Sequence, residues 1–85
     1  MRNIQYRRLY VARFGSGVDK LMLCRIFSAF GPVEEVDYRL KDTKPYCFIQ
    51  FKRVTSVYDA LCVMDKYKIG QQTLIVHLPS SIKMV

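Results

Sequence analysis

The chain has 85 residues and a net charge of +7, and 51% of its residues are hydrophobic, which suits one folded domain with a single small core rather than a disordered segment. No apolar run approaches the roughly 18 residues of a membrane helix, and the first residues lack the apolar segment of a secretory signal, so we expect neither. The basic balance permits a polyanionic partner, with nucleic acid as the first candidate and an acidic protein or an anionic membrane surface as alternatives.

The three cysteines, Cys24, Cys47 and Cys62, are odd in number and widely spaced. This spacing argues against a disulfide framework and against a zinc site. Each lies in an apolar pattern, so we expect small apolar side chains in a reducing compartment, the nucleus or the cytoplasm. His77 is the only histidine, and the sequence predicts neither a metal site nor a cofactor.

The first strand is predicted over residues 8–13 by alternation, with Leu9 and Val11 facing the core and Tyr10 and Ala12 facing outward. A Gly-Ser-Gly turn follows at residues 15–17.

The first helix is predicted over residues 18–30, with Ser16 as its N-cap and Asp19 in its acidic first turn. Gly31 and Pro32 end it. Its core-facing positions recur at i, i+3, i+4 and i+7: Leu23, Ile26, Phe27 and Phe30.

The second strand is predicted over residues 33–40. Placing Val33, Val36 and Tyr38 toward the core requires a β-bulge after Glu34. A short link then leads to the third strand, residues 44–51, whose core face is Cys47, Ile49 and Phe51.

The opposite face of that third strand carries Tyr46, Phe48 and Gln50. The open side of a half-covered sheet is usually polar. Two aromatic side chains there lower solubility unless something stacks on them, so this face indicates a binding surface.

The second helix is predicted over residues 56–67, with Ser56 and Asp59 at capping spacing. Its core-facing positions are Val57, Ala60, Leu61 and Met64. The fourth strand is predicted over residues 73–78. Its inward side chains are Leu74, Val76 and Leu78, and its outward ones are Ile75 and His77.

The order of these elements is β-α-β-β-α-β, which predicts an α+β, ferredoxin-like sandwich: a four-stranded antiparallel sheet with two helices on one face. We expect one domain over residues 8–79, an N-terminal extension over 1–7 and a C-terminal tail over 80–85.

Two motifs resemble those of the RNA recognition motif (RRM) family. The octamer KPYCFIQF at residues 44–51 is similar to the family signature [KR]-G-[FY]-[GA]-[FY]-[VI]-x-[FY], with Pro45 in place of glycine and Cys47 in a small-residue position. The hexamer LYVARF at residues 9–14 matches the second motif. The resemblance implies that Tyr10, Tyr46 and Phe48 stack on unpaired bases.

Basic and polar side chains near these rings complete the predicted RNA site. Lys44 is expected to reach a phosphate, while Gln50 and His77 face outward toward base edges. The remaining members of the predicted positive rim are Arg7, Arg8, Arg13, Arg39, Lys41, Lys52 and Arg53. Asp37 lies on the same face and would repel phosphate, accept from a base amino group, or pair with Arg39 or a lysine.

The predicted function is therefore binding of single-stranded RNA, as part of a ribonucleoprotein in mRNA processing or post-transcriptional regulation. The alternative is an RRM that binds a peptide or a second copy through its sheet or its helical face. The helical stripes leave Leu21, Cys62 and Val63 outside, and Ile75 adds an apolar group to the sheet. We expect a monomer and no enzyme. Acylphosphatases share the general plan, but residues 14–17 lack the catalytic Arg and Asn of their phosphate loop.

Overall fold

A computed structural model describes residues 7–15 and 17–79. The elements in chain order are β1 (Arg8–Ala12), α1 (Lys20–Phe27), the 3-10 helix η2 (Ser28–Phe30), β2 (Val33–Lys41), β3 (Lys44–Phe51), α2 (Val54–Met64), β4 (Lys68–Ile69), β5 (Gln72–Thr73) and β6 (Ile75–His77). The expected tail at 80–85 and all of the expected extension except Arg7 lie outside the described residues, as does Ser16.

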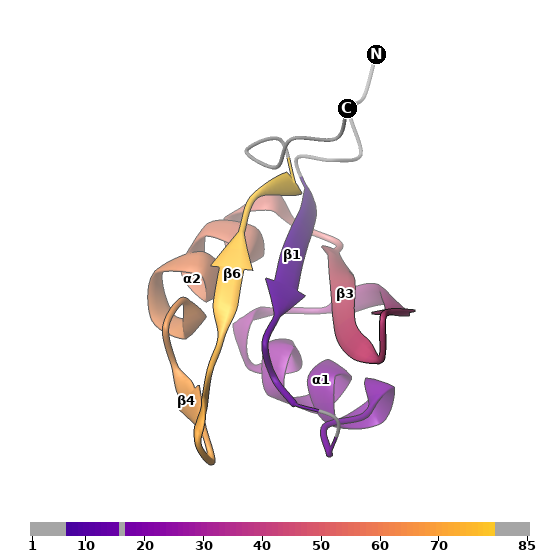
Figure 1. Ribbon diagram of the computed structural model, residues 1–85. Coiled ribbons are helices and arrows are strands. Elements are labelled where there is room, and N and C mark those ends of the chain that lie inside the picture. The colour runs from indigo at the N-terminus through magenta and orange to yellow at the C-terminus, as the bar shows by residue number, and fades with distance from the viewer. Residues whose placement is uncertain (1–6, 16, 80–85) are drawn as a thin grey trace.

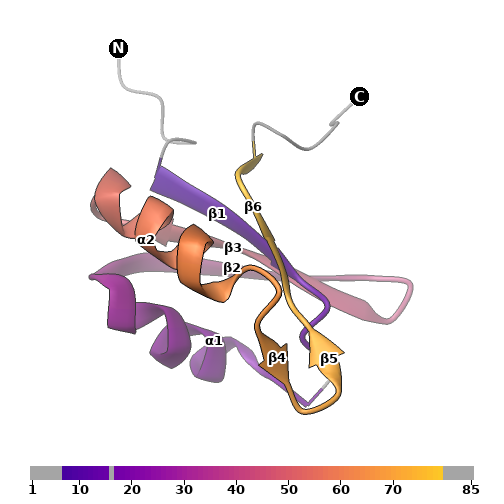
Figure 2. The same cartoon turned by 90° about the vertical axis from the view of Figure 1, so that its left-hand side faces the viewer.

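Four strands form one antiparallel sheet in the order β2-β3-β1-β6, and β4 and β5 pair as a separate hairpin. The two helices cover one face of this sheet and leave the other open (Figures 1 and 2). The predicted ferredoxin-like fold class is confirmed. None of the described helices has the length and apolar character needed to span a membrane.

The core lies between the sheet and the helices. From β3, the side chains of Cys47, Ile49 and Phe51 are fully buried, as the alternation predicts. The other fully buried hydrophobic side chains of the core are Leu9, Val11, Phe14, Leu23, Phe27, Val57, Ala60, Leu74 and Val76. The register of β2 against β3 shifts between Val33 and Glu35, which confirms the predicted β-bulge.

Both helix starts differ from the prediction. α1 begins at Lys20, and its N-cap is Asp19, whose Oδ1 accepts a hydrogen bond of 2.9 Å from the backbone N–H of Met22. α2 begins at Val54, after Arg53, which makes no side-chain capping bond. The predicted capping role of Ser56 is wrong, because Ser56 lies inside α2 with its side chain buried against Gly31.

The end of α2 and the fourth strand also differ. α2 stops at Met64 rather than at residue 67, because Asp65 is extended and its carboxylate accepts a hydrogen bond from the backbone N–H of Val76. The predicted strand at 73–78 is shorter: β6 is Ile75–His77, and Thr73 belongs to the β4–β5 hairpin. Backbone hydrogen bonds of Leu74 with Lys66 and Tyr67 separate β5 from β6.

Candidate nucleic-acid interface

Three aromatic rings lie together on the open face of the sheet. Tyr10 of β1 is directly opposite Phe48 of β3, and Tyr46 is two residues before Phe48 on the same side of β3. The ring centroid of Tyr10 is 5.6 Å from that of Phe48 and 6.0 Å from that of Tyr46. The ring centroids of Tyr46 and Phe48 are 6.1 Å apart. All three side chains are partly exposed, and partial burial raises the pKa of the Tyr10 hydroxyl. The structure therefore brings the three predicted stacking residues into one cluster.

A cluster of charged side chains borders Phe48. Asp37 of β2 is opposite Phe48 and binds Arg39 through two hydrogen bonds, of 2.7 Å to Nη2 and 3.2 Å to Nε. Arg8 of β1 also pairs with Asp37, with 3.5 Å between its Nη2 and the carboxylate Oδ2. The hydrogen bonds from Arg39 hold the pKa of Asp37 below its ordinary value. Of the alternatives for Asp37, the structure shows the ion pair with Arg39.

The turn between β2 and β3 positions two predicted phosphate ligands. Lys41 and Lys44 are paired at the ends of these strands, and the two turn residues between them, Asp42 and Thr43, both have positive φ. This is the geometry of a tight type I′ hairpin. Pro45 remains within β3, opposite Leu40, so proline does not interrupt the strand.

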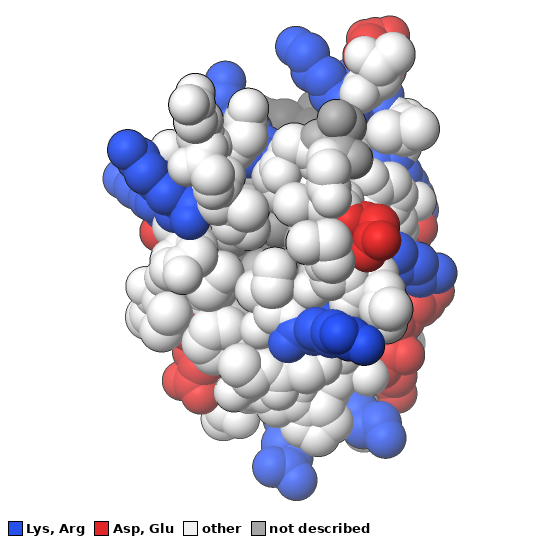
Figure 3. Space-filling model, turned by 90° about the horizontal axis from the view of Figure 1, so that it is seen from below, with Lys and Arg blue, Asp and Glu red and all other residues white. Residues whose placement is uncertain are grey.

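A groove begins at the Tyr10 and Tyr46 rings and runs toward the end of the sheet at which the β2–β3 turn lies. Its walls are the β2–β3 turn on one side and the β4–β5 hairpin on the other, and Arg13, which is exposed, lines it after the end of β1. The other lining side chains include Lys41, Lys44, Gln71, Gln72 and Thr73. Figure 3 shows the molecule from below, where charged side chains are separated by broad uncharged areas.

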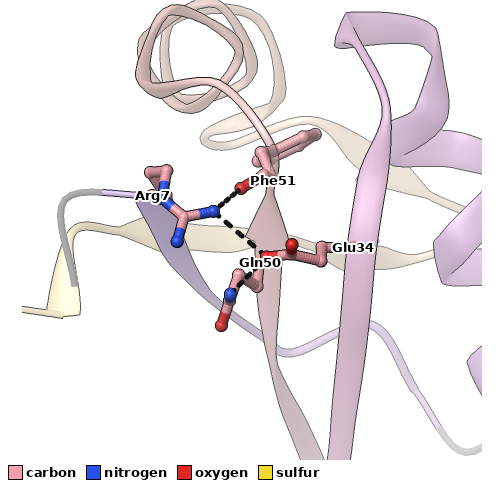
Figure 4. A network of polar contacts seen from close by, with 4 residues as sticks. All are labelled: Arg7, Glu34, Gln50 and Phe51. Carbon is pink, nitrogen blue, oxygen red and sulfur yellow. Dashed lines mark hydrogen bonds and ion pairs between the residues drawn. The ribbon is translucent and has the colours of Figure 1, made fainter. Parts of the chain in front are cut away.

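Gln50 is placed differently from the other predicted contacts. Only 7% of it is exposed, and its amide donates a hydrogen bond to the carboxylate of Glu34 at the β-bulge. Arg7 donates to the same carboxylate at 3.0 Å and to the carbonyl of Phe51 at 3.1 Å (Figure 4). Hydrogen bonds from Gln50 and Arg7 lower the pKa of Glu34. In this arrangement the Gln50 amide nitrogen already has an intramolecular partner.

The remaining predicted residues lie at two ends of the sheet. His77 is exposed on the edge strand β6, directly opposite Tyr10. Lys52 and Arg53 follow Phe51, whose carbonyl accepts from Arg7, whereas Lys44 begins β3 at the other end. Arg8 and Arg39, which also belong to the predicted rim, lie between these two groups, beside the Phe48 ring.

A protein-family model for the RNA recognition motif matches residues 9–75 of the chain. The chain belongs to the RNA recognition motif family.

Solved RRM structures agree with this assignment. The Mip6 RRM3 domain superimposes with a TM-score of 0.81 at 19% identity, covering 88% of this chain and 94% of that chain. The RNA15 RRM structure with bound RNA (GU) has a TM-score of 0.78 at 20% identity, with coverages of 87% and 83%. The N-terminal RNA-binding domain of a hypothetical protein has a TM-score of 0.73 at 26% identity, with coverages of 82% and 75%. A search of curated proteins gave no match.

Sequence reasoning missed three features of this RRM surface. Glu34 binds Gln50 of the neighbouring strand and Arg7, which precedes β1, and Asp37 also pairs with Arg8 of β1. These contacts join segments far apart in the sequence, so only the assembled sheet reveals them. The β4–β5 hairpin lines the groove with amide side chains, and a signal for it was present in Gly70, which has φ 62° at the turn. No cluster of potential metal ligands is present among residues 7–15 and 17–79.

Proposed function

We propose that this RRM binds single-stranded RNA on the open face of its sheet, with Tyr10, Tyr46 and Phe48 as the stacking surface. The observation that carries the proposal is the partly exposed cluster of these rings, with centroids 5.6–6.1 Å apart on two adjacent strands. Every base has a π-face, and a ring held by a strand loses little entropy when a base stacks on it. Single-stranded RNA fits this face because its bases are free to splay outward.

The charges around the rings support a path for the RNA backbone. Lys41, Lys44 and Arg13 line the groove that leaves the Tyr10 and Tyr46 rings, and we propose that they bind phosphates there. His77, beside Tyr10, and Gln50, once released from Glu34, are proposed contacts for base edges. The RNA15 RRM, which has the same fold, was solved with RNA bound, and this supports the same general mode here.

The cellular setting that we propose is correspondingly broad. An RRM with such a face suits a ribonucleoprotein that acts in mRNA processing or other post-transcriptional steps, in the nucleus or the cytoplasm. The free thiols of Cys24, Cys47 and Cys62 are consistent with a reducing compartment.

The test is the double variant Tyr10→Ala/Phe48→Ala, titrated with a pool of short unstructured RNAs at fixed salt. Each stacked base contributes about 1–3 kcal/mol, so we expect binding to weaken by about 2–6 kcal/mol. The matched control is Tyr58→Ala/Tyr67→Ala, which also removes two half-exposed aromatic rings but from outside the open face. Equal affinity of the wild type and the Tyr10/Phe48 variant would contradict the proposal.

A second function, binding of a protein through the helical face, is favoured by one feature of α2. Val54, Tyr58 and Cys62 are spaced at i, i+4 and i+8 and are all exposed, so apolar side chains follow one another along one side of the helix. Leu21 on α1 adds a side chain that is 60% exposed. Sedimentation of the wild type and of Tyr58→Glu tests the version with a second copy. We expect both proteins to sediment as monomers at all concentrations. If the mass of the wild type rises with concentration and that of Tyr58→Glu does not, the wild type dimerises through α2.

A further inference from the structure

One ion pair crosses the sheet beside the central stacking ring. Arg8 and Asp37 belong to β1 and β2, which lie on opposite sides of β3 in the strand order. Their side chains approach to 3.5 Å, so the pair spans the open face of β3. In doing so it brings the guanidinium carbon of Arg8 to 4.9 Å from the centroid of the Phe48 ring, which is a cation–π contact.

Arg39 belongs to β2 and approaches the Phe48 ring from the side of β3 opposite to Arg8. Its guanidinium carbon is 5.6 Å from the Phe48 centroid, and its Nε and Nη2 both donate to Asp37. One carboxylate therefore binds two guanidinium groups against one ring. The side chains of Arg8 and Asp37 are 25% and 28% exposed, and that of Arg39 is 53% exposed, so solvent and ligands reach the cluster.

These positions set up a competition when RNA binds. A base and a guanidinium are both planar groups that use the face of an aromatic ring. A carboxylate and a phosphate both accept paired hydrogen bonds from arginine. The groups that hold the cluster together in the free protein are thus the same kinds of groups that a stacked nucleotide supplies.

We propose that Asp37 is an intramolecular competitor of RNA phosphate: it retains Arg8 and Arg39 on Phe48 until a nucleotide replaces them. The base then takes the guanidinium's place on the ring, and a phosphate takes the place of the carboxylate on the freed arginines. This inference rests on the proposed function. It makes Asp37 a residue that sets the affinity for RNA and the dependence of that affinity on salt.

The test compares two substitutions that each remove one negative charge from β2. Asp37→Asn removes the negative charge from both ion pairs with the arginines. Glu35→Gln changes an exposed residue on the same face of the strand, for which no ion pair is present in the described part of the chain. Binding of a short unstructured RNA is measured at several salt concentrations. We expect Asp37→Asn to bind about three- to thirtyfold more tightly, the effect of removing two partly exposed ion pairs. Glu35→Gln should change affinity by less than about twofold, because salt screens an exposed charge.

The salt dependence provides a readout that a purely structural role of Asp37 would not move. In the wild type, the Asp37 carboxylate that phosphate displaces takes up a cation, which offsets part of the counterion release from the RNA. Asp37→Asn has no such offset, so the slope of log K against log salt becomes steeper by up to about 0.7. Without RNA, the NMR resonances of the Arg8 and Arg39 Nε–H groups and of the Phe48 ring should shift in Asp37→Asn as the guanidiniums leave the ring. Asp37→Ser gives the same comparison should the asparagine variant not fold.

Each outcome separates this inference from the proposed function. RNA binding by the wild type with equal or weaker binding by Asp37→Asn overturns the competition alone, and weaker binding would make Asp37 a residue that positions the arginines for RNA. A wild type that binds no RNA overturns the proposed function and the competition together. Tighter RNA binding with a steeper salt slope in Asp37→Asn, but not in Glu35→Gln, supports the competition between Asp37 and RNA phosphate.

Discussion

The two faces of the sheet are made by the same strands but are organised by different forces. On the covered face, Cys47, Ile49 and Phe51 are fully buried against the helices. They stabilise the fold because their apolar surface is removed from water. On the open face, Phe48 lies between them in sequence but is partly exposed, among rings and paired charges. Alternation along one strand therefore separates a stabilising face from a binding face, and a substitution should affect mainly the property of the face it lies on.

The largest expected contrast is in thiol reactivity. Burial raises the pKa of the Cys47 thiol on the covered face to about 12, whereas Cys62 on the outside of α2 is exposed. Labelling Cys47 requires opening of the core, so we expect it to be at least about a thousandfold slower than labelling of Cys62. Alkylation followed by peptide mass spectrometry measures both rates in one sample, and similar rates would show that the covered face opens readily.

The same pKa shift predicts how stability changes at high pH. The folded state holds the Cys47 proton more tightly than the unfolded state, whose thiol has an ordinary value near 9.0. The contribution of this thiol to the free energy of unfolding is therefore complete below about pH 9 and is lost as the pH rises toward about 12. Denaturant titrations of the wild type and Cys47→Ala at several pH values isolate this contribution.

A truncation in the core gives the next largest effect. Phe51→Ala removes a fully buried ring and leaves a cavity, so we expect the free energy of unfolding to fall by about 3–5 kcal/mol. RNA binding should fall only to the extent that the fraction of folded protein falls. Urea unfolding, with binding measured well below the transition, tests this separation. A large loss of affinity in a fully folded variant would show that the two faces are strongly coupled.

A substitution at Gly31, between the two helices, tests how tightly the helix layer packs on the covered face. The φ of 141° at Gly31 is a conformation that side chains rarely adopt, and a Cβ there would overlap the hydroxyl of the buried Ser56. We expect Gly31→Ala to lower the free energy of unfolding by about 2–3 kcal/mol. Gly17→Ala is the control, since no atom lies within 4 Å of its added Cβ, and it should change stability by less than about 0.5 kcal/mol. Thermal unfolding of both variants is sufficient, and equal melting temperatures would contradict the expectation.

The smallest expected effect belongs to a single charge on the open side. Lys44→Gln removes one exposed cation at the start of β3, and we expect the slope of log K against log salt for RNA binding to decrease by about 0.7, with no change in thermal stability. Lys20→Gln, which removes an exposed cation at the start of α1, should leave that slope unchanged. Equal slopes for all three proteins would place Lys44 outside the RNA path.

Much of this RRM was predictable from its residues. The inward positions of β1 and β3, the spacing of Leu23 and Phe27 and the β-bulge near Glu34 follow from the residues, because each is a local consequence of which side chains must avoid water. Ala12 and Gln50, expected to face outward, are only 8% and 7% exposed. The predicted start of α2 is wrong because Ser56 resembles a cap in sequence but is buried inside α2 by Gly31, whereas α1 begins one residue after Asp19, its N-cap. Local capping signals were overridden at Ser56 by packing between distant segments.

By itself, the sequence determined which side chains of each strand share a face, and so it assigned Tyr10 of β1 and Tyr46 and Phe48 of β3 to the open side. That follows from the two-residue period of a strand, which needs no knowledge of neighbours. Only the tertiary structure decided which strands are adjacent, and with that the pairing of Asp37 to Arg8 across β3 and of Gln50 to Glu34. Charged and polar side chains are satisfied by whichever partner the sheet order brings within reach, so their contacts emerge only when the strands are assembled.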